Sequence, residues 1–119
     1  LYTSGTTGLP KGAHISHRAH IARSMVFAAQ LALDPGDGFI AWAPMFHMAS
    51  TDHALATILR GGTVVMVDGL QPAVINEALS RHRIGWFVMM PGALEAFINE
   101  RHANPLPLKG IKVCGAMAD

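Results

Sequence analysis

Segments of strand length that are apolar at nearly every position alternate along this chain with segments of helical pattern. Helix-start signals stand between them, such as the N-cap candidate Ser16 and Pro72, which suits a first helical turn. The pattern predicts strands at 39–43, 63–67, 85–90 and 111–114, and helices at 17–33, 50–60, 72–82 and 91–102. Continuously apolar strands joined by helices are typical of a mainly parallel sheet covered by helices, so we expect an α/β fold.

Composition limits the class of protein further. The 119 residues are half hydrophobic and carry a formal net charge of +1, which argues against disorder and against a strongly basic nucleic-acid surface. The single cysteine, Cys114, excludes an internal disulfide framework. No apolar run approaches the roughly 20 residues of a membrane span, and no targeting segment is visible, so we expect a cytoplasmic protein without a transmembrane segment.

Both ends of the sequence have the pattern of interrupted elements. Leu1-Tyr2 has the pattern of the last residues of a strand, and the chain stops shortly after the apolar segment that ends at Cys114. We therefore expect residues 1–119 to be a fragment of a longer protein.

The stretch 2–12 carries the strongest chemical signal. It reads Tyr-Thr-Ser-Gly-Thr-Thr-Gly-Leu-Pro-Lys-Gly and combines hydroxyls, glycines and one lysine. Glycines allow backbone N–H groups to approach an anion, hydroxyls donate to phosphate oxygens, and Lys11 adds a positive charge. The stretch predicts a polyphosphate site. It is not the common P-loop, because Pro10 precedes the lysine and Gly12 stands where Ser or Thr is required.

This stretch closely resembles the phosphate-binding motif of the adenylate-forming enzymes, which include acyl-CoA synthetases, luciferases and adenylation domains. The sequence Pro-Met-Phe-His at 44–47 resembles the next motif of that family. Weaker family landmarks are matched at 61–65, 90–91 and 115–116. The resemblance implies an ATP-dependent carboxylate–CoA ligase that joins a small carboxylic acid to AMP and then transfers the acyl group to coenzyme A.

The resemblance also implies roles for individual residues. The β- and γ-phosphates of ATP would be held by Thr3, Ser4, Gly5, Thr6, Thr7, Gly8 and Lys11. His47 would contact the substrate carboxylate, and Phe46 would form a wall of the acyl pocket. Gly115 and Ala116 would flank the adenine and the acyl group. Lys11 and His47 are the catalytic candidates, and neither is expected to act as a general base, since an ionised carboxylate has no proton to lose.

The resemblance also implies that residues 1–119 are a fragment of the family's large N-terminal domain, and that the rest of this domain and the small C-terminal domain lie outside this sequence. The resemblance places the Mg²⁺-ligating Glu, the ribose-binding Asp and the C-terminal Lys after Asp119, so we expect no metal ligands in this chain and no activity from it alone. Two alternatives stay within the family, an adenylation domain that serves a carrier protein and a luciferase-like enzyme. A third is a nucleotide-binding remnant without catalytic activity.

Several further patterns favour structural roles. The three histidines at 14, 17 and 20 have a metal-like spacing, but no acidic or Cys residue stands beside them and the first lies before the helix. His53 beside Asp52 is expected on a solvated helix face. Four methionines, Met45, Met48, Met89 and Met90, are expected mainly in the core rather than in an acyl pocket. The basic cluster at 81–83 is expected to complement a helix dipole. The apolar face of the first helix is predicted as Ile21, Met25, Ala28, Ala29 and Ala32.

Overall fold

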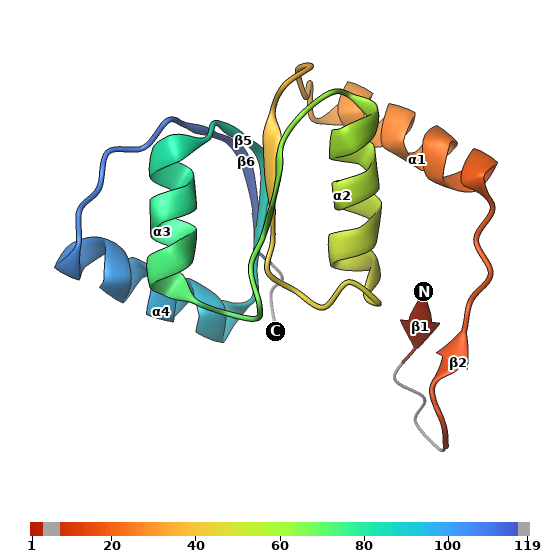
Figure 1. Cartoon of the computed structure of the whole chain (residues 1–119), viewed down its shortest axis with the longest axis horizontal. Helices are drawn as coiled ribbons and strands as arrows, with labels where there is room; N and C mark the ends of the chain where they lie inside the picture. The colour runs from red at the N-terminus through yellow and green to blue at the C-terminus, as the bar shows by residue number, and fades with distance from the viewer. Residues whose placement is uncertain (4–7, 117–119) are drawn as a thin grey trace.

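The computed structural model describes residues 1–3 and 8–116, and for Thr3 the backbone alone. Its main feature is a four-stranded sheet in the order β4-β3-β5-β6, in which every neighbouring pair is parallel (Figure 1). The strands are β3 (Gly38–Ala41), β4 (Val64–Met66), β5 (Ile84–Met89) and β6 (Ile111–Ala116). A separate antiparallel pair is formed by β1 (Tyr2–Thr3) and β2 (Lys11–Gly12).

Helices cover both faces of this sheet, as the alternating pattern predicts. They are α1 (His17–Gln30), α2 (Met48–Leu59), α3 (Pro72–Arg81) and α4 (Pro91–Ala103). α1 and α2 lie on one face, and α3 and α4 lie on the other (Figure 1). The predicted α/β class is therefore confirmed.

The predicted helix boundaries agree with the structure to within a few residues. Ser16 caps α1 as expected, because its side chain accepts from the backbone N–H of Ala19 at 3.2 Å. α1 ends three residues before the predicted Leu33, because the chain turns at Ala32, which has a φ of 49°. α2 begins two residues earlier than predicted, because a histidine, rather than a residue with a typical N-cap side chain, starts it.

Each face of the sheet has its own core. Between the sheet and α3 and α4 lies a large cluster that includes the fully buried Ile75, Leu79 and Phe87. On the opposite face a smaller cluster of Phe39, Ala41 and Ala54 packs under α2, with Trp86 partly buried at its side. Small residues on the second face let α2 approach the sheet closely, and this approach positions the first turn of α2 at the carboxyl ends of the strands.

The apolar face predicted for α1 is wrong. Ile21 and Met25 point to solvent, and Met25 is 68% exposed. The face that meets α2 carries Ser24, which is buried, and His20, whose Nδ1 lies 3.1 Å from a carboxylate oxygen of Asp52. The contact of α1 with α2 therefore includes the small side chain of Ser24 and the pairing of His20 with Asp52. The predicted apolar residues Ile21 and Met25 lie on another face of α1.

The basic cluster at the end of α3 serves tertiary contacts as well as the helix end. Arg81 pairs with Glu77 one turn earlier, as a helix end allows. Arg83 reaches a different element instead: its Nε lies 3.0 Å from the buried carboxylate of Asp37, and the side chain also bonds Asp34. Lys112 of β6 binds Asp34 as well, at 2.7 Å. Ion pairs thus tie the turn after α1 to β5 and β6.

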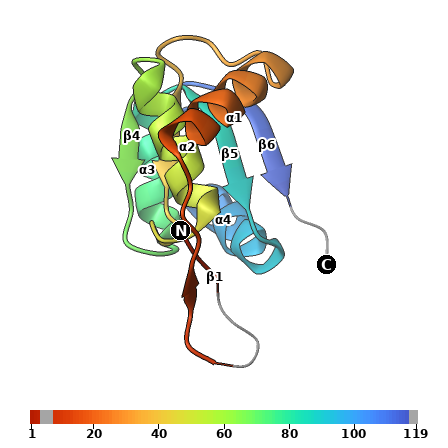
Figure 2. The same cartoon turned by 90° about the vertical axis from the view of Figure 1, so that its right-hand side faces the viewer.

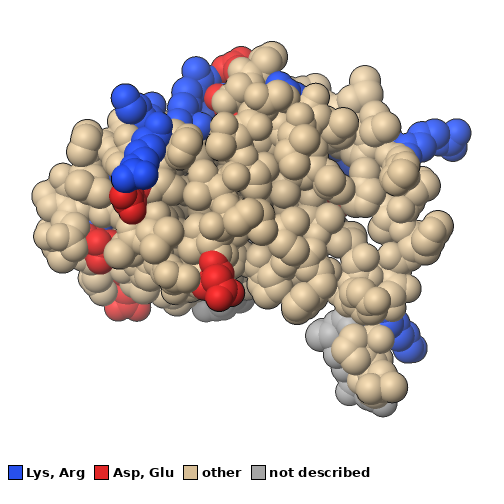
Figure 3. Space-filling view, viewed as in Figure 1, with Lys and Arg blue, Asp and Glu red and all other residues tan. Residues whose placement is uncertain are grey.

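Charged side chains are sparse on the visible surface (Figure 3), as the low content of charged residues predicts. On the face in Figure 3, basic and acidic side chains are few and lie among uncharged residues rather than in one basic patch. No helix in the described part of the chain is both long and apolar enough to cross a membrane. Among residues 1–3 and 8–116, no three His, Cys, Asp or Glu side chains gather as metal ligands do.

Candidate functional site

The glycine-rich stretch begins and ends in the β1–β2 hairpin. Tyr2 pairs with Gly12 and Thr3 pairs with Lys11, so the antiparallel pairing brings the two ends of the predicted phosphate site side by side. The backbone N–H of Ala13 donates to the carbonyl of Leu1 at 2.7 Å and extends the hairpin. Four predicted phosphate ligands, Ser4, Gly5, Thr6 and Thr7, lie outside the described residues.

Gly8 and Gly12, on either side of Lys11, differ in their surroundings. A Cβ built on Gly8 would meet nothing within 4 Å, so the backbone here is open to a ligand. A Cβ on Gly12 would lie 3.5 Å from the ring of Tyr2. Lys11, between them in the hairpin, is exposed. Gly8 and Lys11 are therefore accessible from solvent, as a phosphate site requires.

The hairpin is joined by a backbone hydrogen bond to the second predicted motif. The N–H of Tyr2 donates to the carbonyl of Phe46 at 3.1 Å, across 44 positions of sequence. Figure 2 shows the arrowheads of β4, β5 and β6 pointing toward the end of the molecule where the hairpin lies. The phosphate motif and the aromatic-histidine turn thus meet at the carboxyl edge of the sheet, where ligand sites of open α/β sheets lie.

His47 starts α2 and is itself the cap of that helix. Its ring Nδ1 accepts from the backbone N–H of Ala49 at 3.1 Å. The backbone N–H of His47 donates to the carbonyl of Pro44 at 2.9 Å. A nitrogen that accepts carries no proton in the neutral ring, so the proton of His47 resides on Nε2. The exposed ring therefore presents an N–H donor at the edge of the sheet.

The turn that carries His47 is held by side chains of α2. Ser50 is buried, and its hydroxyl donates to the carbonyl of Ala43 at 2.6 Å. The hydroxyl of Thr51 donates to the carbonyl of Met45. These bonds fix the backbone on both sides of Phe46, whose side chain is 59% exposed. The turn is therefore a rigid support with an accessible aromatic ring, as a pocket wall requires.

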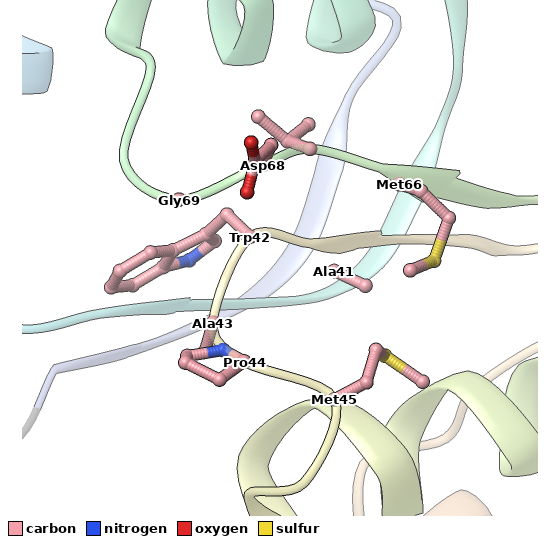
Figure 4. Close-up of a pocket in the computed structure, with 9 residues that line it drawn as sticks. Ala41, Trp42, Ala43, Pro44, Met45, Met66, Asp68 and Gly69 are labelled. Atoms are coloured by element: carbon pink, nitrogen blue, oxygen red, sulfur yellow. The ribbon is translucent and has the colours of Figure 1, made fainter.

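A hollow of about 450 Å³ opens beside this turn, between the ends of β3 and β4. Its lining is mostly apolar and includes Trp42, Met45 and Met66, with Asp68 at the rim (Figure 4). Figure 4 shows the side chains of Met45 and Met66 pointing toward each other on one side of it. The core position expected for the methionines is confirmed for Met89 alone, since the other three predicted methionines are more than two-fifths exposed.

Gly115 and Ala116 lie at the carboxyl end of β6. They pair with Val88 and Met89 of β5, so the two strands end side by side. Sequence reasoning missed their most important neighbour. A Cβ on Gly115 would lie 2.3 Å from Cη2 of Trp86, because the indole ring covers this point of β6. A lone tryptophan in an apolar strand gives no sequence signal of that contact.

His53 is in the interior and not on a solvated face as predicted. Its ring lies 4.6 Å from that of Phe27 and 5.6 Å from that of Trp86, measured between centroids. The pKa of His53 is lowered to about 4, chiefly by burial and to a smaller extent by the positive charges of Arg23 and Arg60, against the opposing effect of Asp52. His53 is therefore neutral at physiological pH and behaves as a packing group.

Asp52, beside it in sequence, belongs to a different contact. Its side chain is 9% exposed and binds Nε of Arg23 at 2.7 Å in addition to His20. No acidic residue stands beside the three N-terminal histidines in the sequence, but the fold brings Asp52 next to His20. The contacts of Asp52 with Arg23 and His20 join α2 to α1. His14 takes no part in them, because it lies in the extended segment before α1.

Cys114 is exposed on β6, and partial burial of its thiol raises its pKa. A raised pKa lowers the fraction of reactive thiolate at neutral pH. These properties do not favour Cys114 as a nucleophile.

Known proteins resemble this chain in both sequence and fold. Residues 1–118 match the family of AMP-binding enzymes. The sulfoacetate–CoA ligase of Cupriavidus necator is 29% identical over 115 residues, which are 96% of this chain and 22% of that protein. The chain thus spans about a fifth of the length of the curated relatives it matches.

Two solved structures of the o-succinylbenzoate–coenzyme A synthetase of Bacillus subtilis are also similar. The complex with AMP has a TM-score of 0.81 at 22% identity and covers 99% of this chain and 30% of that one. The complex with ATP and magnesium ion has a TM-score of 0.74 at 25% identity and covers 84% of this chain and 21% of that one. With the family match over nearly its whole length, the chain belongs to the family of AMP-binding enzymes.

Proposed function

We propose that the protein containing this chain is an ATP-dependent carboxylate–CoA ligase, and that the chain is part of its large N-terminal domain. The observation that carries the proposal is the hydrogen bond from Tyr2 to Phe46, which joins the phosphate motif to the histidine turn. An adenylating enzyme needs a polyphosphate and a carboxylate next to each other, and these two motifs supply one group for each.

The phosphate motif acts by position and charge. Backbone N–H groups around Gly8 and the hydroxyls of the stretch 3–7 bind the β- and γ-phosphates, and Lys11 offsets negative charge that grows on the departing pyrophosphate. Mg²⁺, held by residues outside this chain, neutralises phosphate charge when bound. The chain itself forms no covalent bond to the substrate in this account.

His47 acts on the acid. Its Nε2–H donates to one carboxylate oxygen, and the cap bond from Ala49 to Nδ1 keeps the proton on the outer nitrogen. The other oxygen is free to attack the α-phosphorus of ATP. Phe46 forms a wall of the acyl site, and Gly115 and Ala116 contact the nucleotide and the acyl group from the end of β6.

The reaction then has two steps. A carboxylate oxygen bonds to the α-phosphorus as the bond to pyrophosphate breaks, which gives an acyl-adenylate. The sulfur of coenzyme A, having lost its proton, bonds to the acyl carbon as the bond to AMP breaks, which gives the thioester. The protein's contribution to both steps is orientation and stabilisation of charge.

The experiment uses the full-length protein with ATP, Mg²⁺, a panel of carboxylic acids and coenzyme A. We expect AMP and an acyl-CoA to form in equal amounts with at least one acid. Acyl-adenylate that accumulates with coenzyme A and is discharged by a carrier protein would favour the carrier-protein alternative. Nucleotide binding without AMP formation for every acid would favour a non-catalytic nucleotide-binding protein.

A further inference from the structure

Trp86 covers the end of the predicted acyl site. A Cβ at Gly115 would lie 2.3 Å from Cη2 and 2.7 Å from Cζ2 of the indole, so no side chain fits at that position. The outer ring of Trp86 therefore forms the surface above β6 at this point. An acid that approaches Gly115 along the face of α1 and α2 meets the indole before it meets the strand.

The indole is held from both helices of that face. Phe27 of α1 packs edge-on at 5.3 Å between centroids, and His53 of α2 lies at 5.6 Å. The indole Nε1 is buried and has no hydrogen-bond partner among the described residues, so packing contacts, rather than a hydrogen bond, hold the ring. Three aromatic rings from three elements thus close this part of the molecule, and the indole is not free to swing aside.

The depth of the site follows from helix geometry. His47 caps α2, and His53 comes six residues later on the same helix. At the rise of an α-helix, the two lie about 9 Å apart along the axis. Ala49 stands one turn before His53 and is small and partly exposed, as are Val88 and Gly115 on the facing strands. An acyl chain that extends from His47 along α2 would pass Ala49 and reach His53 and Trp86 about 9 Å further along the helix axis.

We propose that Trp86 is a specificity-determining residue that limits this enzyme to short carboxylic acids. The proposal rests on the proposed function, because it takes the carboxylate to bind at His47. With its carboxylate there, an acid that extends more than about 9 Å along α2 meets the indole and its His53 partner.

The test is the length profile of the full-length enzyme for acetate, butyrate, hexanoate, octanoate and decanoate. The readout is kcat/KM in acid-dependent exchange of pyrophosphate with ATP. Trp86→Phe removes the ring that lies over Gly115, keeps an aromatic partner for Phe27 and removes no side-chain hydrogen bond among the described residues, because the indole Nε1 has no partner there. Trp86→Ala opens the site further. Phe97→Leu is the control, because Phe97 is a buried aromatic residue of α4 that packs on Phe87 in the core on the opposite face of the sheet.

We expect the wild type to prefer the short acids. Trp86→Phe should raise kcat/KM for octanoate at least about tenfold while Phe97→Leu leaves the profile unchanged. A wild type that prefers decanoate, or a Trp86→Phe enzyme of unchanged melting temperature and unchanged profile, would overturn the proposal. Loss of exchange with every acid in the wild type would instead refute the proposed function. If Trp86→Ala does not fold, Trp86→Phe alone decides.

Discussion

The backbone N–H of Tyr2 lies 3.1 Å from the carbonyl oxygen of Phe46. This bond connects the start of the glycine-rich stretch with the turn that presents His47, although no regular element joins them. Because it is formed by backbone atoms, it does not depend on the identity of either side chain. The adjacency of phosphate motif and carboxylate donor is therefore a property of the fold, and four predictions follow from that arrangement and from the packing beneath it.

Lys11 is expected to act on the departing pyrophosphate. Lys11→Ala in the full-length protein should lower kcat for acid-dependent pyrophosphate exchange by about a hundredfold, because one preorganised charge is lost from the transition state. The control is Lys109→Ala, which removes an exposed lysine from the loop before β6. Equal exchange rates in Lys11→Ala and wild type, with the same melting temperature, would remove Lys11 from the mechanism.

His47 has a structural and a chemical role that two substitutions separate. His47→Ala should destabilise the protein by about 1 kcal/mol, because α2 loses its cap, and should raise KM for the acid. His47→Asn keeps an oxygen that accepts from Ala49, so it should restore stability without restoring KM. Thermal unfolding and steady-state kinetics measure the two effects. Recovery of KM in His47→Asn would mean that the ring acts only as a cap.

Gly115 and Trp86 should be energetically coupled. Gly115→Ala should cost about 1–3 kcal/mol of unfolding free energy, because the added methyl overlaps the indole. Combined with Trp86→Ala, the same substitution should cost much less. Gly92→Ala is the matched control, since a Cβ there meets nothing within 4 Å. Additive effects of the two substitutions in denaturant titrations would contradict the observed contact.

Acid should weaken the fold through His53. Burial lowers the pKa of His53 to about 4, whereas its usual value is 6.5, so between these values the unfolded chain binds a proton that the folded chain excludes. The contribution to stability is complete above pH 6.5 and is lost as pH falls toward 4. Urea midpoints should therefore decline less steeply over this window in His53→Phe than in wild type. Parallel declines would show that His53 does not titrate in this way.

The alternation of apolar strands and helices was enough to predict the fold class and most elements. Ser16 and Pro72 mark helix starts through local chemistry, so sequence alone reveals them. The order β4-β3-β5-β6 was not predictable, because it depends on crossovers rather than on local pattern. The inward face of α1 was predicted wrongly for the same kind of reason, since its ion pair involves Asp52, a residue of another helix.

The candidate site was predictable only in part. Motif chemistry and family resemblance indicated Lys11 and His47 but gave no sign that His47 caps α2. The interior position of His53 depends on rings from three other elements, so its neighbour Asp52 was misleading. Trp86 was missed because its contact with Gly115 joins two strands whose pairing the sequence does not specify. Long-range packing, rather than local propensity, determines the positions and contacts of these residues.

The most direct test of the account is carboxylate-dependent exchange of labelled pyrophosphate into ATP by the full-length protein. This exchange requires the phosphate motif and the carboxylate donor to act on one ATP molecule, and it needs no thiol. We predict exchange that depends on a short carboxylic acid, that Lys11→Ala slows about a hundredfold, and that needs a higher acid concentration in His47→Ala. Exchange that is absent with every acid, or that proceeds unchanged in both variants, would contradict the claim that the two motifs form one adenylating site.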